Sequence, residues 1–167
     1  MPRTYGYVGT REVLESVREA PEGSEIRTQE ALRRWAESQQ DWLGDELTAT
    51  FVVTLDGALR VAPQRSEHVA CAGGGQVLAA GELVVRVKPA VEVVHVTNQS
   101  TGYCPEPDCW ASVHAALTAA QIPAPTALSQ SFVFRRCPKC GERNLVKEGW
   151  FECACCGADL PEAWNFA

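Results

Sequence analysis

Residues 48–62 read Thr48-Ala-Thr-Phe-Val-Val-Thr-Leu55, then Asp56-Gly57, then Ala58-Leu-Arg-Val-Ala62. The first run is rich in β-branched residues, which are typical of strands, and the second run returns after the Asp-Gly pair. Asp-Gly between such runs is the signal of a β-hairpin with a two-residue loop. The stretch therefore predicts two neighbouring antiparallel strands in the middle of the chain.

The same pattern continues on the C-terminal side of this hairpin. Four further runs have the composition of short strands, at residues 67–72, 76–80, 83–88 and 92–97. Glycines at 73–75 and at 81 separate them and are expected to form turns. The middle of the chain is therefore predicted to be a compact antiparallel sheet.

Three helices are expected around this sheet. Thr10, Thr28 and Asp108 each precede apolar residues at helical spacing and can act as N-caps. The residues expected along the helix faces are Val13, Leu14 and Val17, then Leu32, Trp35, Ala36 and Gln39 followed by Trp42 and Leu43, and finally Trp110, Val113, Leu117 and Ala120. Gly44 is expected to end the second helix. The predicted fold class is therefore α+β, a small antiparallel sheet with about three helices.

Two Cys-x-x-Cys-Gly turns lie near the C-terminus. Their spacing is Cys-x2-Cys-x12-Cys-x2-Cys, formed by Cys137, Cys140, Cys153 and Cys156. Each turn can place two sulfurs on one side of a metal ion, and the glycine after it allows a tight backbone. Residues 144–147 and 149–152 can form a hairpin between the turns. The pattern resembles a zinc ribbon over about residues 132–160 and predicts Zn²⁺ as the cofactor.

Cys155 is a further cysteine inside the second turn. As a ligand it would need Cys-x-Cys geometry and would misplace Gly157, so Cys156 is the predicted ligand. The alternatives for the four cysteines are a redox dithiol or unrelated thiols. Four thiolates leave no open coordination position, so we expect a structural zinc site whose loss unfolds the lobe.

The charge distribution limits the partners that the protein can bind. The chain has 167 residues and a net charge of −6. Residues 1–130 carry ten basic and sixteen acidic residues, whereas residues 131–160 carry five and four. Phosphate contacts need clustered positive charge, so nucleic-acid binding is expected only through the ribbon, if at all.

The sequence also bears on cellular location. No run approaches the ~20 apolar residues of a membrane helix, so no membrane association is expected. The first residues lack the apolar segment of a secretory signal. Cysteines at metal spacing without such a signal favour reduced thiols, and hence a cytoplasmic protein.

Two parts are predicted along the chain. Residues 1–130 form an α+β body with a Gly-rich antiparallel sheet, and residues 131–167 form the zinc ribbon and a tail. Residues 122–129 contain two prolines and are typical of a linker. Trp164 and Phe166 in the tail are expected to pack back on the body.

A second pattern lies in the body. The run from His68 to Leu83 reads HVACAGGGQVLAAGEL, and residues 97–105 read TNQSTGYCP. Over about residues 50–120, these motifs resemble an uncharacterised domain of bacterial proteins and of plant IQ-motif calmodulin-binding proteins, whose usual form is H-x-S-F-L-A-G-G-x-V-x-A-A-G-E followed by a Ser-Gly-His-Tyr-x-Pro loop. The matching positions are His68, Gly74, Gly75, Ala80, Gly81, Glu82, Ser100, Tyr103 and Pro105. Gly102 stands where the domain has its loop histidine, so chemistry that depends on that histidine is not expected here.

The polar residues of these motifs are the candidate catalytic residues. His68, Glu82, Ser100 and Tyr103 can line a cleft that holds a nucleotide or a sugar. A histidine, a tyrosine and a glutamate on neighbouring strands also resemble the sites of ADP-ribosyltransferases, in residue type only. The alternative is structural, because glycines form turns and bulges and polar loops satisfy their own backbone.

A second metal site is a further alternative. His68, Cys71, Cys104 and Cys109 occur as His-x-x-Cys and Cys-x4-Cys pairs, both usable for zinc. Free cysteines are also commonly small buried apolar residues.

Two functions from different classes follow from these patterns. The first is a zinc-binding cytoplasmic protein that acts as a binding or adaptor module, with a protein as the expected partner. The second is a nucleotide- or NAD-using enzyme, ADP-ribosyltransferase-like, with a pocket around His68 and Tyr103. The oligomeric state is left open.

Overall fold

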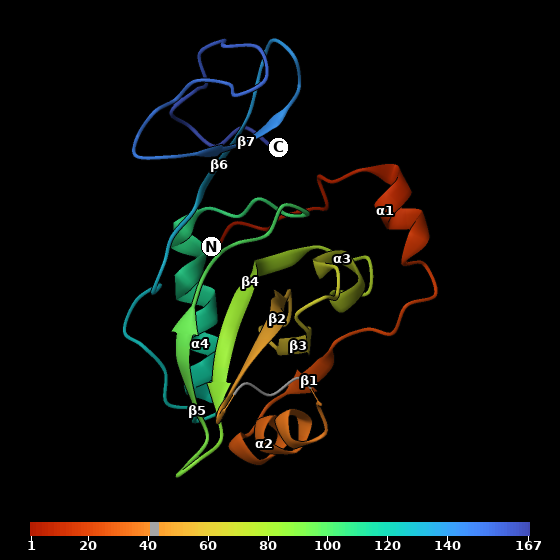
Figure 1. The fold of residues 1–167 in the computed structure, drawn as a ribbon, viewed down its shortest axis with the longest axis vertical. Coiled ribbons are helices and arrows are strands. Elements are labelled where there is room, and N and C mark those ends of the chain that lie inside the picture. The colour runs from red at the N-terminus through yellow and green to blue at the C-terminus, as the bar shows by residue number, and fades with distance from the viewer. Residues whose placement is uncertain (41–43) are drawn as a thin grey trace.

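The computed structural model describes residues 1–40 and 44–167. Within them, five strands form one antiparallel sheet in the order β1-β3-β2-β4-β5, and two more form a separate hairpin (Figure 1). The strands are β1 (Ser24–Ile26), β2 (Glu46–Thr54), β3 (Leu59–Pro63), β4 (Val77–Arg86), β5 (Glu92–Val96), β6 (Val133–Arg136) and β7 (Arg143–Val146). The helices are α1 (Arg11–Ser16), α2 (Gln29–Glu37), α3 (His68–Cys71) and α4 (Trp110–Ala119), with the 3-10 helix η1 (Pro107–Cys109). The predicted α+β class is confirmed.

The central hairpin joins β2 to β3 as predicted, but its loop is longer than predicted. The Thr54 N–H donates to the Ala58 carbonyl at 2.9 Å, so Leu55, Asp56 and Gly57 form a three-residue loop. Gly57 has φ +83°, the left-handed conformation that ends such loops. Asp-Gly therefore marks the turn correctly, and the extra residue leaves Leu55 exposed.

Two of the strand predictions are wrong in detail. Residues 67–72 contain the short helix α3, whose Val69, Ala70 and Cys71 are buried. Short apolar runs do not distinguish a strand from a buried helical turn. The predicted strands 76–80 and 83–88 are largely parts of one continuous strand, β4, which covers Val77–Arg86.

Gly81 lies within β4 and does not interrupt it. Glycine is needed at this position for close packing and not for a turn. A Cβ atom at Gly81 would lie 1.9 Å from the Thr97 carbonyl oxygen. A side chain at this position is incompatible with the neighbouring backbone.

The first two helices, α1 and α2, begin directly after the threonines that were predicted to cap them. Thr10 and Thr28 accept hydrogen bonds from the amides of Val13 and Ala31. Leu32, Trp35 and Ala36 of α2 are buried, whereas α1 has no buried residue. Helix α2 ends at Glu37 with Ser38 as its C-cap, so the predicted end at Gly44 is wrong. Trp42 and Leu43, which were expected to follow this helix, fall outside the described residues.

The third predicted helix, α4, begins differently from the prediction. Asp108 lies inside η1 and does not cap α4, whose N-cap is Cys109. Val113, Ala116 and Leu117 of α4 are buried, and the helix contacts β2, β3 and β4 (Figure 1). This face of the sheet and α4 therefore enclose much of the apolar core.

The expected linker is attached to the edge of the sheet. The Val93 amide donates to the Pro123 carbonyl at 2.8 Å, and the Ser129 amide donates to the Val96 carbonyl at 2.8 Å. These bonds cover part of the free edge of β5, which would otherwise offer unpaired backbone groups to another strand. The chain thus reaches the ribbon along a fixed path.

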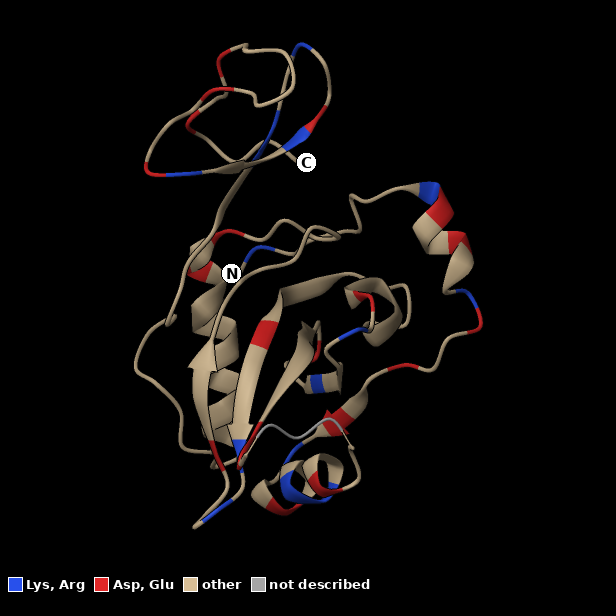
Figure 2. Cartoon of the chain, viewed as in Figure 1, with Lys and Arg blue, Asp and Glu red and all other residues tan. Residues whose placement is uncertain are grey.

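Charged residues of both signs lie on α1, α2, the ribbon and the connecting loops, whereas the strands of the sheet carry few (Figure 2). Among the described residues, no helix combines the length and apolar character needed to cross a bilayer.

Candidate metal centre

The C-terminal lobe is built on the β6–β7 hairpin. Phe134 pairs with Leu145 and Arg136 with Arg143, so the two strands lead directly into and out of the first cysteine turn. The predicted hairpin of residues 144–147 and 149–152 is reduced to one bridge between Lys147 and Trp150. The first turn, between β6 and β7, therefore organises the main pairing, which the cysteine spacing alone did not indicate.

The two cysteine turns have the same backbone geometry. In the first, the Cys137 amide donates to Glu142 and the Gly141 amide donates to the Cys137 carbonyl, at 2.8 and 2.9 Å. In the second, the Cys153 amide donates to Ala158 and the Gly157 amide to the Cys153 carbonyl, again at 2.8 and 2.9 Å. Gly141 and Gly157 have φ +81° and +75°, which explains why glycine follows each turn.

The two turns bring four sulfurs together. The Sγ atoms of Cys137, Cys140, Cys153 and Cys156 all lie within 4.8 Å of one another. The Cys137–Cys156 and Cys140–Cys153 distances are both 3.6 Å. Tetrahedral zinc with Zn–S bonds of ~2.3 Å places its sulfurs about 3.8 Å apart, so the donor set and its spacing fit this metal.

Amide groups around the cluster favour thiolates. The pKa of Cys153 is lowered to about 6, mainly because the Cys156 amide donates a hydrogen bond to its sulfur. The pKa of Cys137 is lowered by the Cys140 amide, 3.4 Å from its sulfur. Thiolates are the form that binds metal, so the backbone prepares Cys137 and Cys153 for it. For Cys140 and Cys156, the amides of Glu142 and Ala158 lower the pKa, but desolvation and the neighbouring sulfurs raise it by more, so the pKa of each is raised.

Asn144 is a supporting residue that the sequence did not reveal. Its Nδ2 lies 3.4 Å from the Cys153 sulfur, and its Oδ1 accepts from the Ala154 amide at 2.9 Å. Both contacts fix the second turn from β7, and no spacing rule singles out such an asparagine. Groups of this kind orient ligands and tune their basicity.

The repeated geometry also separates Cys155 from Cys156. Cys156 occupies the position of Cys140 in the second turn, and Cys155 that of Lys139. Cys155 is exposed, and its amide donates to the Cys153 sulfur at 3.4 Å. Cys156 is thus the residue whose sulfur joins the group.

The other predicted ligands, His68, Cys71, Cys104 and Cys109, do not come together. Among the described residues, the four cysteines of the ribbon are the one group whose ligand atoms lie close enough together to hold a metal ion. The Cys71 sulfur lies 3.7 Å from the Arg60 carbonyl, and that of Cys104 lies 3.6 Å from the Thr101 carbonyl. Burial raises the pKa of Cys71, Cys104 and Cys109 to about 12 each. These cysteines are buried thiols within the body.

The structure places His68 at the start of α3, where it joins two elements. Its Nε2 lies 2.8 Å from the Gly81 carbonyl on β4. Desolvation lowers the pKa of His68, which favours the neutral ring. Because a carbonyl oxygen only accepts, the contact with Gly81 requires the proton on Nε2. Glu82, the next residue of β4, accepts a hydrogen bond from Gln64 at 3.0 Å.

Ser100 and Tyr103 lie within one buried turn of the 97–108 loop. The side chain of Ser100 is 1% exposed and accepts from the Tyr103 amide at 3.3 Å. Tyr103 is fully buried, and its hydroxyl donates to the Gly75 carbonyl at 2.7 Å. The polar atoms of both residues therefore make structural contacts, which gives no support to a reactive pocket around them.

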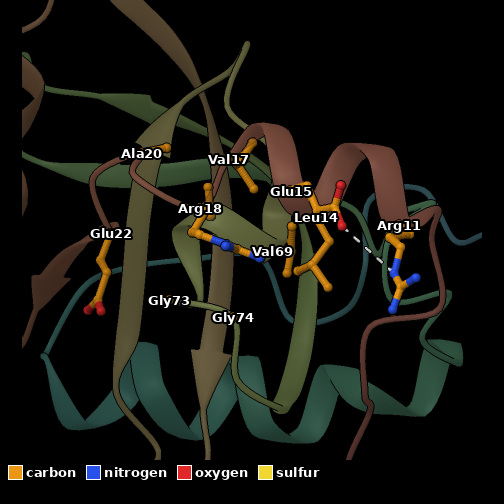
Figure 3. A pocket seen from close by; sticks show the side chains of 11 residues that line it. Arg11, Leu14, Glu15, Val17, Arg18, Ala20, Glu22, Val69, Gly73 and Gly74 are labelled. Atoms are coloured by element: carbon orange, nitrogen blue, oxygen red, sulfur yellow. Dashed lines mark ion pairs between the residues drawn. The ribbon is translucent and has the colours of Figure 1, made fainter.

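A surface cavity of about 440 Å³ lies elsewhere, between α1 and the α3 turn (Figure 3). Leu14 and Val17 face Val69 across it. Arg11 and Glu15 at its rim pair with each other at 3.8 Å. None of the four candidate catalytic residues lines this cavity.

Comparison with models of protein families finds no match, and comparisons with curated proteins and with solved structures likewise find none. The four-cysteine group on a two-stranded hairpin is therefore consistent with a zinc ribbon, without an identified family.

Proposed function

We propose that the protein is a zinc-binding adaptor of the cytoplasm, in which a structural metal site holds a lobe that binds a protein partner. The observation that carries the proposal is the closed group of four sulfurs within 4.8 Å of one another. Four cysteine ligands saturate zinc and leave no position for substrate or water. The metal is thus assigned a structural task.

The surface of the ribbon supports a binding role. Trp150 is 70% exposed, and its indole N–H donates to Glu152 at 3.0 Å. Leu145 is 38% exposed on the same hairpin. Trp150 follows a tight turn, in which Glu148 and Gly149 both adopt positive φ and the Trp150 amide donates to the Lys147 carbonyl. Exposed aromatic side chains are frequent anchors in protein interfaces.

The metal half of the proposal is tested by measuring the zinc content of the purified protein. One zinc per chain is expected for the wild type and less than one tenth of that for Cys153→Ser. A wild-type protein without zinc would contradict the proposal.

The partner half is tested by affinity purification of the tagged protein from its native host, with Trp150→Ser as the variant. A protein that the wild type retains and Trp150→Ser loses would support an interface at this turn. The control is Leu55→Ser, which alters an exposed apolar residue on the body. Identical partner sets for all three proteins would contradict the role of Trp150.

A nucleotide- or NAD-using activity stays a prediction of the sequence alone. A ligand present at about one hundred times its Kd stabilises a protein by about 2.7 kcal/mol. Thermal unfolding with NAD, ATP and ADP-ribose therefore tests it directly. The buried contacts of Ser100 and Tyr103 lead us to expect no shift.

A further inference from the structure

The ribbon is joined to the body by a buried asparagine. Asn98 is fully buried, and its Nδ2 donates to the carbonyls of Pro105 and Phe132 at 2.9 and 2.8 Å. Its Oδ1 accepts from the Phe132 amide at 2.7 Å. One side chain thus ties the 97–108 loop of the body to the residue that enters β6.

A buried ion pair forms the second connection. Arg135 on β6 donates to the two carboxylate oxygens of Glu106 at 2.7 and 3.4 Å. The side chains are 6% and 19% exposed. The same guanidinium donates to the Glu162 carbonyl, at 3.1 and 2.6 Å, and to the Phe134 carbonyl at 2.7 Å. Glu162 belongs to the segment that follows the second cysteine turn, whereas Glu106 belongs to the body. The guanidinium therefore keeps all of its partners only when the ribbon is folded and docked on the body.

The tail supplies a third connection. The Trp164 indole donates to the Cys104 carbonyl at 2.8 Å, and its ring lies edge-on to Tyr5 with 5.5 Å between centroids. The Tyr5 hydroxyl in turn accepts from the Glu106 amide at 3.2 Å. Arg143 of β7 also donates to the Thr101 carbonyl. The 97–108 loop is therefore held from several sides by residues of the ribbon and its tail.

The apolar cluster of the ribbon is too small to maintain these contacts without metal. Its buried members are Val146, Leu160 and two of the cysteines, Cys137 and Cys153. Lobes of this size are generally unfolded without their zinc. An unfolded ribbon no longer positions the Glu162 carbonyl, and the Arg135–Glu106 pair becomes solvated, where such pairs contribute little.

We propose that zinc loading of the ribbon controls the order of the 97–108 loop on the body, with Arg135 and Trp164 as the connecting residues. The proposal rests on the proposed zinc binding and adds a regulatory consequence to it. With zinc, the loop is clamped between the sheet and the ribbon. Without zinc, the loop loses its contacts with β6 and the tail while the five-stranded sheet remains folded. Any partner that contacts the loop is then bound in a zinc-dependent way.

Hydrogen exchange of the full chain, read by mass spectrometry with and without a strong chelator, tests this coupling. Peptides from 131–160 report the ribbon, peptides from 97–108 report the loop, and peptides from β2 and β4 are the internal reference. Chelation is expected to speed exchange in the ribbon and to speed it at least about tenfold in the loop, because the loop loses its contacts with Arg135, Arg143 and Trp164 and opens more often. The sheet peptides are expected to change little.

Two variants test the connection without touching the metal ligands. Arg135→Lys cannot form the paired hydrogen bonds, and Glu106→Gln removes the charge from the body side. Both should keep one zinc per chain and show faster exchange in the loop of the zinc-loaded protein. The control is Arg136→Lys, whose guanidinium donates to Gly141 and lies over Phe166 within the ribbon and tail. It should leave exchange in the loop unchanged.

The outcomes separate the two proposals. A protein without zinc would overturn zinc binding and the coupling together. A protein that holds one zinc, but whose loop exchanges at the same rate after chelation, would overturn the coupling alone. Unchanged loop exchange in both Arg135→Lys and Glu106→Gln would also overturn it.

Discussion

The sheet and the ribbon are stabilised by different physical means. The sheet has a continuous core in which Phe51, Val52, Leu83 and other side chains are fully buried on its two faces. The ribbon buries only a few apolar side chains, and two of its buried residues are predicted metal ligands. The body can thus fold through apolar burial, whereas the ribbon depends on coordination bonds. This difference predicts that the two parts respond differently to the same perturbation.

The largest expected effect is the loss of the metal. Structural zinc contributes about 10–16 kcal/mol of apparent binding free energy in isolated zinc-finger peptides, far more than a ribbon of this size gains from its core. Cys153→Ser should therefore unfold residues 131–160. NMR spectra should show those amides collapse to unfolded shifts, while the signals of β2 and β4 remain dispersed. A ribbon that stays folded in Cys153→Ser would contradict the comparison.

A change in the sheet should have a smaller effect that spreads through the whole body. In Gly81→Ala the new Cβ would meet the Thr97 carbonyl oxygen at 1.9 Å and the Asn98 Cα at 3.0 Å. Backbone cannot yield as a side chain does, so we expect a loss of about 3 kcal/mol in the free energy of unfolding, measured by urea denaturation.

Gly75→Ala is the matched control for this glycine. A Cβ at Gly75 would lie 3.7 Å from the Ala72 carbonyl oxygen, an ordinary contact. We expect a change of under about 1 kcal/mol there. Equal losses for the two variants would show that Gly81 is not a close-packing position.

The features that the sequence could predict are those that depend on residues close together along the chain. The threonine caps, the Asp56-Gly57 turn and the cysteine turns depend on residues a few positions apart, and the structure shows each of them. Glycine is required within β4 at position 81 because the Thr97 backbone packs against it. The ribbon docks on the body through the ion pair between Arg135 and Glu106. Such partners are distant in sequence and follow no spacing rule. From the sequence, Arg135 could therefore be recognised only as one of the positive charges of the ribbon.

The candidate site divides in the same way. The four cysteine ligands lie at positions that local spacing predicts, and their sulfurs converge. His68, Ser100 and Tyr103 were grouped by residue type alone, and each makes its own contact with the backbone. Polar residues in a Gly-rich sheet can serve close packing as readily as chemistry, and only their partners distinguish the two.

The third prediction is that acid destabilises the body through His68. His68 is half-buried, and desolvation of its charged ring lowers its pKa, whereas the hydrogen bond to Gly81 and the nearby Glu82 and Glu67 act in the opposite direction. The unfolded chain therefore binds more protons below about pH 6.5, the ordinary histidine value. The stability linked to neutral His68 is complete above that pH and is lost as pH falls, by at most about 1.4 kcal/mol per pH unit.

His68→Gln is the variant that isolates this effect, because its amide can still donate to the Gly81 carbonyl. Urea denaturation of both proteins at pH 7.5 and 5.5 gives the difference in the free energy of unfolding. The advantage of the wild type should shrink at the lower pH. An advantage that grows on acidification would contradict a desolvated, neutral histidine.

The smallest expected effect is that of Cys155→Ser, and the same change at the adjacent Cys156 is its comparison. Cys155 is exposed, and the contact that it makes to the site runs through its backbone amide, which a serine retains. Cys155→Ser should therefore keep one zinc per chain and a folded ribbon. Cys156→Ser, one residue away, removes a sulfur that lies 3.6 Å from Cys137 and should lose the metal. Zinc analysis of the two variants compares nearly identical chemical changes at neighbouring positions. If Cys155→Ser also lost its zinc, the repeated geometry of the two turns would not define the ligands, and the second turn would bind metal through a different pair of sulfurs.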